Sequence, residues 1–240
     1  MPIDAVFLDV GGVFVLPEHE HIAGALARAE VEVDRAQLDR AHYVGVAALE
    51  QFVEGDRTVW EAYNIAYARA CGADDKRLTD AVEALFNEFT VAEVWTRTIP
   101  GSRQGLQRIA DLGPKLAIVS NADGTVEDQL RSHGICQVGP GPGVPVHAVL
   151  DSTVVGVSKP DPRIFELALD RLGISADRAV HVGDTPAADV VGARAAGIRP
   201  LLIDPYDLHP TLDVERVRSL ADVVDLLGAE RATASSLDPL

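Results

Sequence analysis

Short apolar runs that end on a polar residue recur along the chain, and amphipathic helical patterns separate them. The runs AVFL, LAIV, AVHV and LLI are followed by or end at Asp9, Ser120, Gly183-Asp184 and Asp204, respectively. Continuous apolar runs of this length are typical of strands buried on both faces, as in a parallel sheet covered by helices. The alternation therefore predicts an α/β fold with a doubly wound parallel sheet, in which ligands bind beyond the carboxyl ends of the strands.

One long segment interrupts this alternation. Residues 17–97 contain only helical patterns, and Pro100-Gly101 marks the return to alternating elements. We therefore predict an α/β core from residues 1–16 and 98–228, with an inserted all-helical cap at residues 17–97. The polar tail at residues 229–240 is predicted to be mobile, and VGPGPGVP (residues 138–145) is predicted to be a flexible loop because it has too little apolar content for a helix or strand.

The composition limits the classes of partner. The chain has 240 residues and a formal net charge of −16, which excludes non-specific binding of nucleic acid and attraction to an anionic membrane. Its two cysteines, Cys71 and Cys136, are too far apart for a metal-binding spacing and are expected to be reduced thiols. Because the chain shows neither a signal-peptide pattern nor an apolar run of membrane-spanning length, we predict a cytoplasmic protein.

Four motifs occur in order, each at a predicted strand end or loop. They are FLDVGG, IVSN, SKPDPRIF and GDTPAAD, and together they resemble the haloacid dehalogenase-like (HAD) hydrolase superfamily. The resemblance covers the core from residue 5 to about residue 203. It implies a Rossmann-like core, with a helical cap inserted after the first motif.

The first and last motifs supply carboxylates that suit phosphoryl chemistry. A carboxylate that attacks phosphorus forms an acyl-phosphate and divides one difficult step into two. Magnesium prefers oxygen ligands and can bridge the nucleophile and the phosphate. Asp9 is thus the candidate nucleophile and, with Asp184, a candidate metal ligand. The resemblance implies a third ligand, the backbone carbonyl of Gly11.

Further residues are candidates for holding the phosphate and the catalytic groups. Ser120 can donate to a phosphate oxygen, together with the backbone N–H of Asn121, and Lys159 is a compact cation suited to hold phosphate beside a carboxylate. Asp189 resembles the second acid of the family's last motif, which supports the lysine and the metal shell. Arg57, in a predicted loop between cap helices, is a candidate contact for the leaving group.

Structural roles remain open for several of these residues. Asp189, and with less support Asp184, could cap the helix that follows. Lysines are usually solvated, and Lys159 is one of only three in the chain. For Arg57, the loop setting favours a solvated arginine over a contact with the leaving group.

These observations predict a magnesium-dependent phosphatase that hydrolyses a small phosphorylated metabolite through an aspartyl-phosphate intermediate. One alternative is a binding or regulatory protein built on a weakened HAD core. Another is a HAD hydrolase acting on a carbon–halogen or carbon–phosphorus bond. Gly11 and Asp184 argue against dehalogenation, while cleavage of a phosphonate needs a cap lysine, for which Lys76 is the only candidate.

Gly11 also raises a question about proton transfer. In the family, an acid at this position protonates the leaving oxygen and later deprotonates the attacking water. A glycine cannot do either, so a cap residue such as Glu18 or His19 is a candidate replacement. The sequence leaves the substrate and the oligomeric state open.

Overall fold

The structure is a computed structural model that describes residues 3–49, 57–90 and 94–236. Its centre is a six-stranded sheet in which every pairing is parallel. In spatial order the strands are β10 (Glu215–Val217), β9 (Arg199–Ile203), β8 (Ala179–Gly183), β1 (Ala5–Leu8), β4 (Lys115–Ser120) and β7 (Ala148–Asp151). The predicted parallel α/β fold is confirmed.

The strand order reverses beside β1. The chain runs from β1 to β4 and β7 on one side, and then crosses to β8, β9 and β10 on the other. Phe7 of β1 accordingly lies opposite Ala117 in one neighbour and His181 in the other. A reversal of this kind opens a crevice at the carboxyl ends of the strands, where ligands bind in open α/β sheets.

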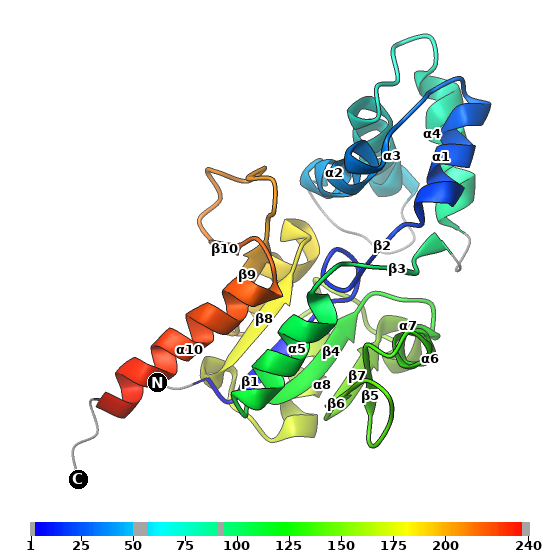
Figure 1. Cartoon of the computed structure of the whole chain (residues 1–240). Coiled ribbons are helices and arrows are strands. Elements are labelled where there is room, and N and C mark those ends of the chain that lie inside the picture. Colours follow the sequence, from blue (N-terminus) through cyan, green and yellow to red (C-terminus); the bar gives the residue numbers. More distant parts are fainter. Residues whose placement is uncertain (1–2, 50–56, 91–93, 237–240) are drawn as a thin grey trace.

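Helices cover both faces of the sheet (Figure 1). Alternate residues of β1 enter two different apolar clusters: Val6 and Leu8 join one, and Ala5 and Phe7 join the other. The first cluster is closed by α5 (Ser102–Asp111), α6 (Val126–Ser132) and α10 (Leu220–Ser236), and the second by α8 (Arg163–Leu172) and α9 (Val191–Ala195). The strands are therefore buried on both faces, which explains their uninterrupted apolar sequences.

Four helices form a separate bundle beyond one end of the sheet (Figure 1). They are α1 (His19–Arg28), α2 (Arg35–Ala47), α3 (Arg57–Ala70) and α4 (Leu78–Phe89). The bundle has its own apolar core, which includes Ile22, Leu26, Tyr67 and Leu85. The chain enters through β2 (Val15–Leu16) and returns through β3 (Arg97–Thr98), and these two strands pair with each other. We call these helices the helical bundle.

The structure differs from the sequence-based expectations in two places. Helix α10 continues to Ser236, so the tail predicted to be mobile from residue 229 is helical for most of its length. The segment 138–145, expected to be a loop, begins and ends in the short paired strands β5 (Cys136–Val138) and β6 (Val144–Val146), because Val144 and Val146 are buried against the main apolar cluster.

The remaining short helices are α7 (Ser152–Val155), the 3₁₀ helix η2 (Ala176–Arg178) and the π-helix η3 (Pro186–Val190). Within the described ranges, no helix combines the length and the apolarity needed to cross a lipid bilayer.

Candidate active site

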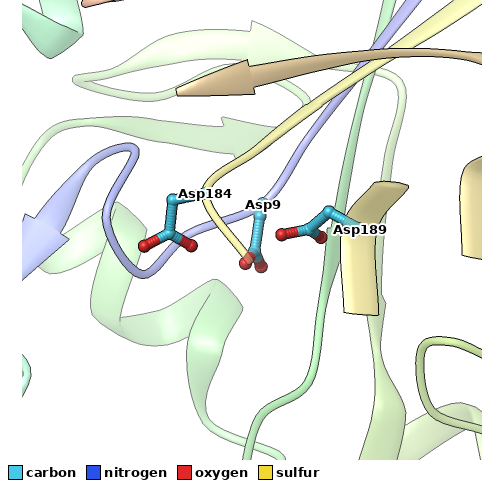
Figure 2. A group of neighbouring side chains, drawn as sticks. All are labelled: Asp9, Asp184 and Asp189. Carbon is cyan, nitrogen blue, oxygen red and sulfur yellow. The ribbon is translucent and has the colours of Figure 1, made fainter. Parts of the chain in front are cut away.

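Three carboxylates meet at the carboxyl ends of the central strands. Asp9 follows β1, Asp184 follows β8, and Asp189 belongs to η3 just beyond. One oxygen from each lies within 4.8 Å of the others, and Figure 2 shows the carboxylates of Asp184 and Asp189 on either side of Asp9. The adjacent parallel strands β1 and β8 thus bring together residues that are 175 positions apart in the sequence.

Two glycines allow these carboxylates to approach the backbone. Gly12 has a φ of +64°, and a Cβ atom there would lie 2.0 Å from Oδ2 of Asp184. A Cβ atom on Gly183 would lie 2.2 Å from Cγ of Asp189. Gly11 is different, because its nearest contact to an added Cβ is Trp95 at 4.0 Å. Space and backbone conformation therefore demand glycine at residue 12 but not at residue 11.

Lys159 joins two of the carboxylates. Its Nζ lies 2.8 Å from Oδ1 of Asp9 and 2.7 Å from Oδ1 of Asp189. The side chain is only 1% exposed, so the surface role considered for this residue is wrong. A buried cation between two anions keeps its charge, and the two carboxylates raise the pKa of Lys159 despite the opposing effect of burial.

Asn121 fixes the backbone of Lys159. The Asn121 side chain accepts a hydrogen bond from the backbone N–H of Lys159 at 2.8 Å and donates to its carbonyl at 2.9 Å. The sequence suggested a role only for the backbone N–H of Asn121. Its amide side chain ties the end of β4 to the loop that carries the lysine.

Asp189 is fully engaged by its neighbours. Besides Lys159, it is bonded to Nε2 of His181 at 2.8 Å and accepts from the backbone N–H of Thr185 at 2.9 Å. Lys159 and His181 hold the pKa of Asp189 well below the usual value for an aspartate, although burial acts in the opposite direction. Asp189 lies inside η3, and its side chain supports the lysine.

The surroundings of Asp9 disfavour its ionised form. Burial raises the pKa of its carboxyl from 3.8 to about 6; Lys159 opposes this rise, whereas Asp189 and Asp184 add to it. One lysine therefore only partly compensates three closely spaced carboxylates. An additional positive charge at this point would stabilise the ionised form of Asp9.

His42, which the sequence did not single out, links the helical bundle to this cluster. Its Nε2 lies 2.9 Å from Oδ2 of Asp184, and its Nδ1 lies 3.0 Å from the hydroxyl of Tyr63. Burial raises the pKa of Tyr63 well above 10, so its hydroxyl stays protonated. A neutral imidazole satisfies both contacts, with Tyr63 donating to Nδ1 and Nε2–H donating to Asp184.

A cavity of about 570 Å³ lies between the sheet and the helical bundle. Asp9, Gly11, Ser120, Asn121, Lys159 and Asp184 border it on the sheet side. From the bundle, the described residues that border it include His42 and several aromatic side chains. The structure therefore gathers six of the predicted site residues around one cavity.

The remaining predicted residues lie elsewhere. Glu18 accepts from Thr96, and His19 is bonded to Asp39 at 2.7 Å; neither borders the cavity. The side chain of Arg57 lies outside the described residues. Asp204 accepts from the backbone N–H groups of two residues in the loop after β9, so its role in the structure is to hold that loop.

A family model described as haloacid dehalogenase-like hydrolase matches residues 3–197. This range contains all four motifs, the helical bundle and the carboxylate cluster. The chain belongs to the haloacid dehalogenase-like hydrolases. The predictions of this family and of a hydrolytic enzyme are confirmed.

Known proteins show the same relationship. The chain is 31% identical over 177 residues to mouse haloacid dehalogenase-like hydrolase domain-containing protein 3, with 72% of this chain and 67% of the mouse protein covered. It is 34% identical over 156 residues to phosphoserine phosphatase of Thermus thermophilus, with 63% of this chain and 58% of that enzyme covered. The chain spans 53% to 67% of the length of its first curated relatives.

The solved structure of the HAD hydrolase YfnB from Bacillus subtilis, which is bound to magnesium, aligns with a TM-score of 0.59. The alignment covers 95% of this chain and 100% of YfnB at 18% identity. At this level of identity the similarity concerns the fold alone.

Proposed function

We propose that the protein is a magnesium-dependent phosphatase that hydrolyses a small phosphorylated metabolite through an aspartyl-phosphate on Asp9. The observation that carries the proposal is the buried Lys159, bonded to Asp9 and Asp189 beside the oxygen cluster. A lysine in this place both orients the nucleophile and supplies positive charge for an incoming phosphate dianion.

The residues at the cavity have distinct roles in this proposal. The Asp9 carboxylate attacks phosphorus, a P–O bond to Asp9 forms, and the bond to the leaving oxygen breaks. Ser120 and the backbone N–H of Asn121 donate to the phosphate oxygens, while Lys159 holds the phosphate and Asp9 together. Water then attacks phosphorus, so that inorganic phosphate leaves and the Asp9 carboxylate is restored.

The donor set fits magnesium. Asp9, Asp184 and the carbonyl of Gly11 would hold the ion through oxygen atoms, which magnesium prefers over nitrogen or sulfur. Bound magnesium would neutralise negative charge on the nucleophile and the phosphate. The raised pKa of Asp9 supports this assignment, because burial and the neighbouring carboxylates disfavour its ionised form more than Lys159 favours it, and a bound cation would favour that form.

The relatives favour phosphatase chemistry over the alternatives. One is a phosphoserine phosphatase, and Asp184, an acid absent from the dehalogenase branch, is present and buried. Cleavage of a phosphonate would need Lys76 at the cavity, but Lys76 is exposed and is not among the residues that border it. A purely regulatory role would make the intact set of Asp9, Ser120 and Lys159 unnecessary.

Hydrolysis of phenyl phosphate is expected to require added magnesium and to stop when EDTA is added. Release of inorganic phosphate measures the rate, and excess magnesium added after EDTA should restore it. Full activity in EDTA would contradict the assignment of Asp9 and Asp184 as metal ligands. Absence of turnover with every phosphate ester would favour a binding or regulatory protein instead.

Gly11→Asp is expected to flatten the dependence of the rate on the pKa of the leaving alcohol. A positioned acid–base group contributes about 10²–10⁴ in rate, and the wild type lacks it at this position. Esters of poor leaving groups should therefore gain most, because their departure depends most on protonation. The side chain can be accommodated, since the nearest atom to an added Cβ belongs to Trp95 and lies 4.0 Å away. The check is a plot of log kcat/KM against leaving-group pKa for both proteins.

A shallow plot in the wild type that Gly11→Asp leaves unchanged would contradict this prediction. His42 is the residue from the bundle to test in that event, because it borders the cavity and contacts Asp184.

A further inference from the structure

The bundle side of the cavity is lined mainly by rings. The aromatic residues that border it are Trp60, Tyr63, Phe86, Phe89 and Trp95. Successive rings contact one another: Trp60 packs on Tyr63, Tyr63 on Phe89, and Phe89 on Trp95, with centroid separations of 5.5–5.6 Å. Such walls favour a flat apolar group over a small hydrated one.

Among the described residues that border the cavity, one has a buried polar side-chain atom without a hydrogen-bond partner. Asn64 is 1% exposed, and its Oδ1 accepts no hydrogen bond within the described part of the chain. Of the buried side-chain atoms in that condition, it alone belongs to a residue that borders the cavity. Buried carbonyl oxygens are almost always paired, so an unpaired one beside a cavity points to a donor supplied by the ligand.

The charges of the described residues around the cavity disfavour an anionic leaving group. Among the described residues that border it, Lys159 is the only lysine or arginine, and it is already bonded to Asp9 and Asp189. The bundle side contributes no described residue with a permanent charge. A carboxylate or second phosphate on the leaving group would therefore find no free counter-charge among these described residues, and burial of an unpaired charge is strongly unfavourable.

Gly11 also favours an aromatic leaving group. It borders the cavity, and the nearest atom to an added Cβ is the Trp95 ring at 4.0 Å. The absent side chain thus leaves room beside an aromatic wall. It also leaves the leaving oxygen without an acid at this position, and esters of phenols tolerate that loss better than esters of alkyl alcohols because phenolates leave more readily than alkoxides.

We propose that this cavity takes the phosphate ester of an uncharged aromatic alcohol that carries a hydrogen-bond donor, and that Asn64 Oδ1 accepts from this donor. The inference rests on the proposed phosphatase function and names its substrate class. Asn64 is then a specificity-determining residue, because it accepts a hydrogen bond from the donor of the substrate. Serine phosphate is disfavoured for a different reason, since no described residue that borders the cavity offers a free positive charge to the carboxylate of its leaving group.

Matched esters test the proposal with the wild-type protein and magnesium. The 3- and 4-hydroxyphenyl phosphates are compared with their methoxy counterparts, which have similar leaving-group pKa values but no donor. At one of these two ring positions, we expect kcat/KM of the hydroxy ester to be about tenfold higher than that of the matching methoxy ester. 4-Carboxyphenyl phosphate and phosphoserine should be slower than phenyl phosphate by more than about tenfold.

Asn64→Leu should bring the ratio of kcat/KM for the hydroxy and methoxy esters close to one. Asn87→Leu, an exposed asparagine on α4 outside the cavity, is the matched control and should leave the ratio unchanged. The melting temperature of Asn64→Leu shows whether a changed ratio comes from a lost contact with the substrate or from a destabilised protein. Replacing an unpaired buried carbonyl should not lower the melting temperature. An unchanged ratio in Asn64→Leu, or loss of folding in that variant with no hydroxy preference in the wild type, would overturn the proposal.

Binding without turnover gives an independent measurement. The chain has two tryptophans, Trp60 and Trp95, and both border the cavity. Hydroquinone should therefore change tryptophan emission with a lower Kd than 4-methoxyphenol, and Asn64→Leu should remove the difference. If hydroquinone shows this preference but no ester is hydrolysed, the proposed phosphatase function fails, while the proposal that Asn64 accepts a hydrogen bond from the ligand stands. If esters are hydrolysed but charged leaving groups are preferred, only the substrate class fails.

Discussion

Asp9→Asn is expected to abolish hydrolysis while the protein stays folded. An amide cannot form the acyl-phosphate, and removal of a nucleophile lowers kcat by at least about 10³-fold. The stability of the variant provides a second readout. Burial raises the pKa of Asp9 from 3.8 to about 6, so the ionised carboxyl opposes folding at neutral pH when no metal is bound. Metal-free Asp9→Asn should therefore melt at a higher temperature than the wild type at pH 7.

The stabilisation by Asp9→Asn should depend on pH, because the pKa of Asp9 is higher in the folded protein than in the unfolded chain. A carboxyl whose pKa is higher in the folded protein costs nothing below the unfolded value of 3.8, where it is protonated in both states. The cost grows between pH 3.8 and about 6 and stays constant above. The difference in melting temperature should therefore disappear at low pH, as measured by calorimetry in EDTA.

Asp161→Asn is the matched control for Asp9→Asn. Asp161 is paired with Arg163, at a distance of 2.6 Å, in an exposed setting away from the cavity. The Asp161→Asn variant should retain full turnover. Turnover by Asp9→Asn close to that of the wild type would contradict covalent catalysis at this residue.

Lys159→Met is expected to reduce both activity and stability. The substitution keeps most of the side-chain volume but leaves Asp9 and Asp189 buried without their shared cation. Removing one partner from a buried ion pair typically costs about 3–5 kcal/mol, and at 2–4 °C per kcal/mol for a chain of this size the melting temperature should fall by roughly 10 °C. Turnover should fall with it, because the phosphate and Asp9 would repel each other.

The stability loss in Lys159→Met should also depend on pH. The pKa of Asp189 is held low in the wild type, so its contribution is present above the unfolded value of 3.8 and is lost as the pH falls through the lower folded value. The melting temperatures of the two proteins should therefore converge in acid. Lys76→Met, at an exposed lysine, is the control and should behave as the wild type. A neutral-pH melting temperature and turnover equal to those of the wild type in Lys159→Met would contradict the role assigned to Lys159.

The sequence by itself determined the sheet and the carboxylates at its edge. Runs such as AVFL and AVHV are apolar throughout, because parallel strands are buried on both faces. Parallel strands present their carboxyl ends at one edge, so Asp9 after β1 and Asp184 after β8 had to lie near each other once those strands became neighbours. This information is local to each strand and is readable without a structure.

The motif resemblance supplied Lys159 and Asp189, while local patterns left a surface lysine and a helix cap open for them. The structure resolves this point through burial: the Lys159 side chain is 1% exposed and lies between two carboxylates. Whether a lysine is solvated or buried depends on which distant segments cover it. Periodicity in its own segment therefore could not decide the question.

Only the tertiary structure revealed what the helical bundle contributes. His42 meets Asp184 across 142 positions of sequence, and nothing in the pattern of α2 distinguishes a histidine that contacts a carboxylate from one in an apolar core. Asn64 is similar, because its unpaired oxygen matters only where α3 faces the cavity. Local sequence encodes the periodicity of a helix, but the packing of the whole bundle against the sheet decides which side chains reach the cavity, since that depends on contacts between residues far apart in the chain.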